Sequence, residues 1–105
     1  MARLPKIWTL DTYTVDTMTD IAVIGADGAI VKSIIVTNTS GATATVDLII
    51  SDNVDTKLFT ILPGAILEPG AVYKFPIEAL PLSPSTKIRG SVDIAGVEFL
   101  VSGAE

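Results

Sequence analysis

Residues 29–50 read AIVKSIIVTNTSGATATVDLII, and this stretch decides the fold class. In residues 29–37 both alternating sets of side chains are largely apolar, which is typical of a central strand covered on two faces. Residues 43–50 instead alternate with a period of two, typical of a strand with one buried face. Ala44, Val46, Leu48 and Ile50 are predicted to point inward, and Thr43, Thr45 and Asp47 outward. The turn-forming residues 38–41 lie between the two runs, so we expect them to form a hairpin.

Further short β-branched runs, separated by Gly, Pro, Asn and Asp, fill the chain on both sides of this stretch. Strands are predicted at residues 8–15, 20–24, 56–62, 71–75, 86–92 and 97–102. We expect Pro63-Gly64 to end the run at 56–62, the last two runs to form a terminal hairpin, and residues 76–85, with three prolines, to be an irregular connection. The fold class is therefore an all-β antiparallel sandwich, Ig-like or jelly-roll-like, of about seven or eight short strands. A small closed barrel is the alternative.

The N-terminal residues 1–7 are interpreted as an extended arm, because Pro5 disfavours regular strand pairing, and residues 8–105 as a single β-sandwich domain. Trp8 follows the arm directly, and both core packing and docking onto a partner are open to it. An aromatic residue next to a mobile arm commonly anchors that arm to a neighbour. The candidate partner-binding residues are Arg3, Leu4, Lys6, Ile7 and Trp8.

The composition favours contacts with other subunits. In 105 residues, 49% are hydrophobic and 18% are charged, more apolar and less charged than an ordinary soluble domain. A chain this small has too much surface to hide all of these side chains, so we expect part of them to face a neighbour. A monomeric hydrophobic domain is the alternative, since folded surfaces are largely apolar in any case. The net charge of −5 disfavours nucleic-acid binding. No signal peptide or membrane-spanning run is predicted.

Catalytic chemistry is not expected. The chain contains no His and no Cys, which removes the usual general base and the usual transition-metal ligands. We therefore predict no enzyme activity, no cofactor and no metal. The one local cluster of oxygen ligands is Asp52-Asn53-Val54-Asp55, which lacks the spacing of an EF-hand loop. An Asx-type turn between two strands is the favoured interpretation of this cluster, with a calcium site as the alternative.

The strand–turn–strand unit of residues 31–48 resembles one that is common in small structural proteins of tailed bacteriophages. The turn at residues 67–71 and the closing run of residues 95–105 look similar to the same group. The resemblance covers roughly residues 29–105 and is one of style, because bacterial surface and adhesion sandwiches share it. It implies an assembly role without an active site, as capsid decoration, neck or tail accessory component. Residues 1–28 fall outside the resemblance and are a candidate attachment segment.

The expected function is that of a virion structural protein that decorates or cements a phage capsid. Its expected partners are the major capsid protein or other virion proteins and further copies of itself, with a trimer favoured. Its expected location is the virion, after synthesis in a host cytoplasm. The alternatives are a tail, collar or head–tail connecting component and, from another class, a carbohydrate- or ligand-binding sandwich. Removing residues 1–7 is expected to weaken attachment while leaving the β-fold intact.

Overall fold

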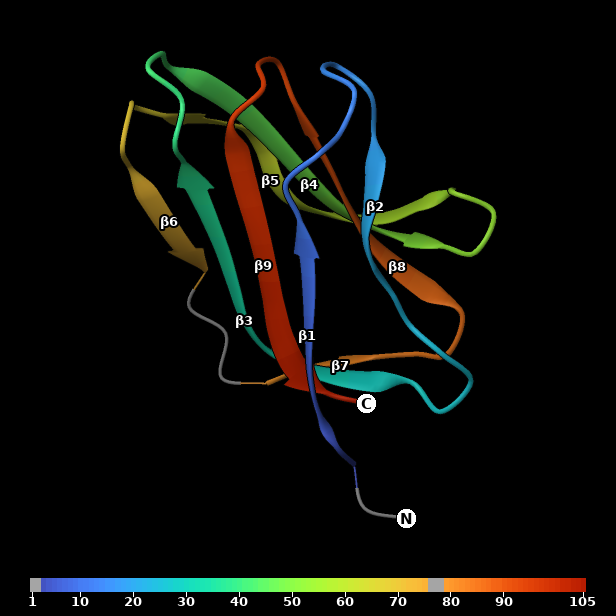
Figure 1. Ribbon diagram of the computed structural model, residues 1–105. Coiled ribbons are helices and arrows are strands. Elements are labelled where there is room, and N and C mark those ends of the chain that lie inside the picture. The colour runs from blue at the N-terminus through green and yellow to red at the C-terminus, as the bar shows by residue number, and fades with distance from the viewer. Residues whose placement is uncertain (1–2, 76–78) are drawn as a thin grey trace.

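The chain folds as an all-β antiparallel sandwich (Figure 1). The structure is a computed structural model and describes residues 3–75 and 79–105. Nine strands occur in these residues, where about seven or eight were predicted. They are β1 (Pro5–Leu10), β2 (Thr19–Val23), β3 (Ala29–Asn38), β4 (Ala44–Asp52), β5 (Lys57–Leu67), β6 (Val72–Phe75), β7 (Leu80–Leu82), β8 (Thr86–Val92) and β9 (Val97–Ala104).

The strands form two sheets that pack face to face. Sheet A has the order β1-β9-β3-β6, and β7 also pairs with β3. Sheet B has the order β2-β8-β4-β5. Strand β3 is central in sheet A, as its sequence predicts, with β9 on one side and β6 and β7 on the other.

The core lies between the sheets and is built mainly from the alternating side chains of the strands, with adjacent pairs such as Ile61-Leu62 at irregular positions. In β4 the predicted inward positions are confirmed, because Ala44, Val46 and Leu48 are fully buried and Ile50 packs against the core. The inward residues of β3 and β9 face them from the other sheet. Fully buried side chains at these positions include Val31, Ile34, Val36, Val97 and Val101.

Neither of the two predicted hairpins forms. Strands β3 and β4 lie in different sheets, and so do β8 and β9, so each connection crosses from one sheet to the other. A period of two shows which side chains are buried but does not show which strand lies next to it. The five residues between β3 and β4 can connect two strands of one sheet or cross to the other sheet. The two crossings meet at one end of the sandwich, where Thr39 N donates to Gly96 O at 2.8 Å.

The buried side chain of Asn38 closes this end of the sandwich. Its Nδ2 donates to the carbonyl oxygens of Ala42, Leu67 and Glu68 at 2.8–3.2 Å. Its Oδ1 accepts from Ser40 N at 3.0 Å and from Ser40 Oγ at 2.6 Å. One amide group thus holds together the β3–β4 connection and the β5–β6 turn.

Strand β5 continues past Pro63-Gly64, so the predicted end at residue 62 was wrong. Proline is tolerated because β5 is the edge strand of sheet B and needs no hydrogen-bond donor on its open side. Gly64 has φ 64°, and its N–H donates to Asp47 Oδ1 at 2.7 Å, which stabilises a bulge. In the predicted irregular connection, residues 80–82 form β7, while residues 76–78 lie outside the described residues.

The expectation that Pro5 prevents pairing was also wrong. Strand β1 starts at Pro5, which pairs with Ala104, and it ends at Leu10 rather than at residue 15. Because β1 is an edge strand, proline is compatible with its first position. Residues 5–7 therefore belong to the sandwich, and removing residues 1–7 would delete half of β1.

The segment after β1 is fastened by Tyr13. Its hydroxyl donates to Ile94 O at 3.1 Å and accepts from Val97 N at 3.0 Å. Its ring meets Phe99 edge-on, with the ring centroids 6.2 Å apart. Burial raises the pKa of the Tyr13 hydroxyl, opposed by its hydrogen bond with the Val97 backbone. Tyr13 therefore ties the β1–β2 connection to the turn between β8 and β9.

Candidate interaction surface

The outer face of sheet A carries apolar side chains that no described element covers. Strand register places Thr9 of β1, Leu100 of β9 and Ile35 of β3 in one row across the sheet. Ile35 and Leu100 are half-buried, although no described element covers this side of the sheet. The prediction that β3 is covered on both faces is therefore wrong within one chain: its inner face is buried and its outer face is open.

An open groove of about 320 Å³ lies on this face, towards the end of the sandwich where the crossings meet. Its apolar part is made by Ile35 and Leu100, and its acidic groups are Asp11 and Glu98. Thr9 and Thr37 complete the side-chain lining, and Leu10 and Phe99 contribute from β1 and β9. The groove thus combines an aliphatic floor with two carboxylates.

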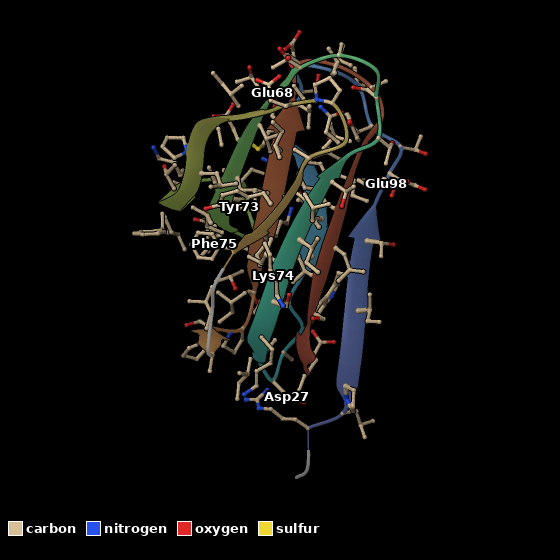
Figure 2. The ribbon with its side chains drawn as sticks, turned by 90° about the vertical axis from the view of Figure 1, so that its left-hand side faces the viewer. Asp27, Glu68, Tyr73, Lys74, Phe75 and Glu98 are labelled. Carbon is tan, nitrogen blue, oxygen red and sulfur yellow. The ribbon has the colours of Figure 1, made fainter. Side chains whose placement is uncertain are left out.

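The described charged side chains on the outer face of sheet A do not form ion pairs with one another. Figure 2 shows Lys74 on β6 and Glu98 on the same side of the molecule, with Tyr73 and Phe75 turned towards the second sheet. Within residues 3–75 and 79–105, no ion pair forms at Lys74, Glu98 or Asp11. These charges are therefore available to groups on another molecule.

The outer face of sheet B is different, because its charges compensate one another. Lys87 Nζ lies 2.8 Å from Asp55 Oδ1 and 3.2 Å from Asp20 Oδ2. Arg89 Nε donates to Asp20 Oδ1 at 2.7 Å. The hydrogen bond from Lys87 lowers the pKa of Asp55, and the bonds to Asp55 and Asp20 raise the pKa of Lys87. The charges around β2 and β8 are thus compensated within the chain, while Val23 and Ile66 are exposed elsewhere on sheet B.

The β4–β5 hairpin carries a second group of exposed apolar side chains. Val54, Leu58 and Phe59 are 72%, 58% and 63% exposed. Figure 1 shows the tip of this hairpin projecting sideways beyond β2 and β8. Sequence reasoning missed this group, although the adjacent pair Leu58-Phe59 next to a turn was a usable signal.

The hairpin is held in one conformation by its turn. Asp52 Oδ1 accepts from Val54 N at 3.0 Å and from Thr56 N at 2.9 Å, as in an Asx-type turn. The favoured interpretation of residues 52–55 is therefore confirmed. Asp55 has φ 68° and pairs with Lys87, which fastens the turn to β8. In the part of the chain that the structure describes, no group of three or more His, Cys, Asp or Glu residues is placed to hold a metal ion.

The five candidate partner-binding residues lie in different surroundings. Arg3 donates to the carbonyl oxygens of Asp27 and Gly28, in the β2–β3 turn. Leu4 and Ile7 are exposed, and Ile7 lies on the outer face of sheet A. Trp8 is only 8% exposed and belongs to the core, so core packing is the interpretation that the structure supports.

The Lys6 side chain also makes contacts within its own chain. Its Nζ donates to Glu105 Oε1 at 2.7 Å and lies 5.3 Å from the centre of the Trp8 ring. Glu105 Oε2 accepts from Gly25 N at 2.9 Å. The Lys6 ammonium and then the Gly25 N–H lower the pKa of Glu105. This contact fastens the start of β1 to the end of β9.

No family model matches this sequence, and no curated protein or solved structure shows significant similarity to it. Among the residues that the structure describes, no helix is long and apolar enough to cross a membrane. The functional inference therefore rests on the chemistry of the surface.

Proposed function

We propose that the protein is a non-catalytic assembly subunit that docks onto a neighbouring protein through the outer face of sheet A. The observation that supports this most directly is the half-buried pair Ile35 and Leu100, which occupies the middle of an uncovered sheet. Exposed apolar patches rimmed by polar groups commonly mark protein–protein contacts. The paired charges on the outer face of sheet B provide the contrast within the same molecule.

The size of the face is sufficient for a specific contact. The strands of sheet A together contain 31 residues, and at about 3.4 Å per residue along a strand and about 4.8 Å between strands they span about 500 Å². Burying this area on both partners removes about 1,000 Å² from water, the lower limit for a specific interface. The acidic rim and Lys74 would set the orientation of the partner.

The setting that we propose is a tailed-bacteriophage virion, in which the protein decorates or cements the capsid shell. This rests on the resemblance of residues 29–105 to phage structural sandwiches and on the surplus of apolar side chains. A cement protein stabilises a shell by adding contact area between neighbouring subunits. In a tail, collar or connector role, the protein would bind its neighbour through the same outer face of sheet A.

A carbohydrate-binding role receives less support. Such sites commonly present several exposed aromatic rings. Of the six aromatic residues, Trp8, Tyr13, Tyr73, Phe75 and Phe99 pack in or against the core, and Phe59 alone is exposed.

Electron microscopy of virions from the phage that encodes the chain tests the proposed setting. Density for the sandwich at regular capsid positions is expected, and density at the tail or neck would favour the alternative role. Leu100→Asp should remove the protein from particles, because it places a charge in the apolar centre of the face. Val23→Asp, at an exposed position of sheet B, is the matched control and should leave occupancy unchanged. Particles that lack the protein altogether would contradict the virion setting.

A further inference from the structure

The apolar tip of the β4–β5 hairpin and the groove on the outer face of sheet A have matching properties. Val54 lies on the turn closed by Asp52 and the Asp55–Lys87 pair, and Leu58 and Phe59 lie at the start of β5 directly after it. A pre-organised segment loses little conformational freedom on binding, which favours its use as a docking element. An exposed Phe on such a segment is a common anchor in interfaces.

The groove on the outer face of sheet A is large enough for this tip. A closed cavity of about 150 Å³ is enough to bind benzene. The groove, at about 320 Å³, has room for the Phe59 ring together with one aliphatic side chain such as Leu58. Its floor of Ile35 and Leu100 matches their apolar character.

The charges of the two surfaces are also complementary. Lys57 directly precedes Leu58-Phe59 and is exposed, while of the two acids of the turn Asp55 is paired with Lys87 and Asp52 accepts backbone hydrogen bonds within the turn. The groove carries the carboxylates of Asp11 and Glu98. Within the described residues, none of these three groups on the opposing surfaces has an ion-pair partner.

We propose that the hairpin tip of one copy, with Phe59 as the anchor and Lys57 as the charged contact, docks into the sheet A groove of a second copy. This rests on the proposed function, since it names the occupant of the same face. The tip projects from sheet B (Figure 1). The groove is lined by residues of β1, β3 and β9 in sheet A, so a chain does not fill its own groove.

Such a contact joins two different surfaces and is therefore heterologous. Until the assembly closes, one free tip remains at one of its ends and one free groove at the other. Heterologous contacts generate a ring when the rotation closes and an open filament when it does not. A closed ring agrees with the expected trimer.

A mixing experiment separates this arrangement from a two-fold dimer. Phe59→Asp removes the tip and keeps the groove, while Leu100→Asp removes the groove and keeps the tip. Light scattering after size exclusion should show assembly beyond the dimer for the wild type, monomers for each variant alone, and a heterodimer for their equal mixture. Ile66→Asp, at a position of β5 that is 71% exposed, is the matched control and should assemble as the wild type does.

Two further variants keep the test independent of folding. Lys57 and Glu98 are both exposed, so Lys57→Glu and Glu98→Lys should fold normally, as circular dichroism can verify. Each should weaken assembly, and the double variant should restore it. Phe59→Asp should raise the Kd about 30-fold, as expected for an aromatic hot spot.

Three results would overturn the self-docking. They are a wild type that stays monomeric up to about 1 mM, an assembly that ignores Phe59→Asp, and a variant mixture that yields no heterodimer. A monomeric chain that still binds virions through a face sensitive to Leu100→Asp would refute the self-docking alone. Loss of both properties would refute the proposed function as well.

Discussion

Replacing Asn38 by alanine should destabilise the sandwich more than any single surface change, because one amide group serves two chain connections. Its side chain makes five hydrogen bonds, three as donor and two as acceptor. Alanine removes all of them at a position with no solvent exposure. No described side chain takes over these contacts.

The size of the loss in unfolding free energy depends on how many former hydrogen-bond partners of Asn38 become accessible to water after the substitution. The Leu67 carbonyl accepts in a fully buried bond, so losing its partner costs about 1–3 kcal/mol. The other bonds are partly buried, so their groups regain water and together add about 1–2 kcal/mol. The expected loss is about 3 kcal/mol. It corresponds to a fall in Tm of about 10–20 °C.

Urea unfolding followed by circular dichroism measures this loss. With an m-value of about 1.5 kcal/mol/M, the midpoint of Asn38→Ala should fall by about 2 M relative to the wild type. Asn38→Asp is the matched control, since it keeps the shape and the two accepted bonds but faces three carbonyl oxygens. These carbonyls favour a protonated carboxyl, so its folded-state pKa should be raised. Its destabilisation relative to the wild type should therefore shrink as the pH falls. A midpoint for Asn38→Ala within about 0.3 M of the wild type would refute this reasoning.

Two further changes probe the β1–β9–β3 region. Gly103→Ala should lower the unfolding free energy, measured in urea, by about 1–3 kcal/mol, because a Cβ there would overlap the Ile30 carbonyl oxygen. Gly41→Ala is the control and should have no effect, because a Cβ at Gly41 would have no atom within 4 Å. Equal effects of the two substitutions would contradict the close approach of Gly103 to Ile30. The pKa of Glu105 is lowered by Lys6, so this contact stabilises the fold above the ordinary value of 4.5 and the stabilisation is lost as the pH falls through the lower folded value. Lys6→Gln should therefore flatten the fall in Tm between about pH 6 and about pH 3, and an unchanged slope would exclude the contact as its cause.

The strands could be predicted from the sequence because alternation and turn residues are local signals. Strand β4 shows this best: its period of two identifies the buried set, and the structure buries Ala44, Val46 and Leu48. Strand pairing is not local. The connection after Asn38 has turn-forming residues whether the next strand joins the same sheet or the opposite one, so the predicted hairpin was wrong.

Edge positions explain the other errors. Proline in a strand run was taken to end pairing, yet Pro5 and Pro63 both lie in edge strands, where one side of the backbone needs no donor. Which strand is an edge depends on the sheet order, and the sequence does not contain that order in any short segment. The candidate site was missed for the same reason, since Ile35 and Leu100 become neighbours only through the pairing of β3 with β9.

The contrast between the two outer faces is nevertheless present in the sequence, strand by strand. In β8 the outward set carries Lys87 and Arg89, and the folded chain supplies the acids that pair with them. In β3 and β9 the outward sets carry Ile35 and Leu100, and no element within residues 3–75 and 79–105 covers them. A strand that is apolar on both faces needs two covering layers, while a sandwich provides one. We propose that the second layer for sheet A comes from another molecule, and this is the physical basis of the proposed assembly role.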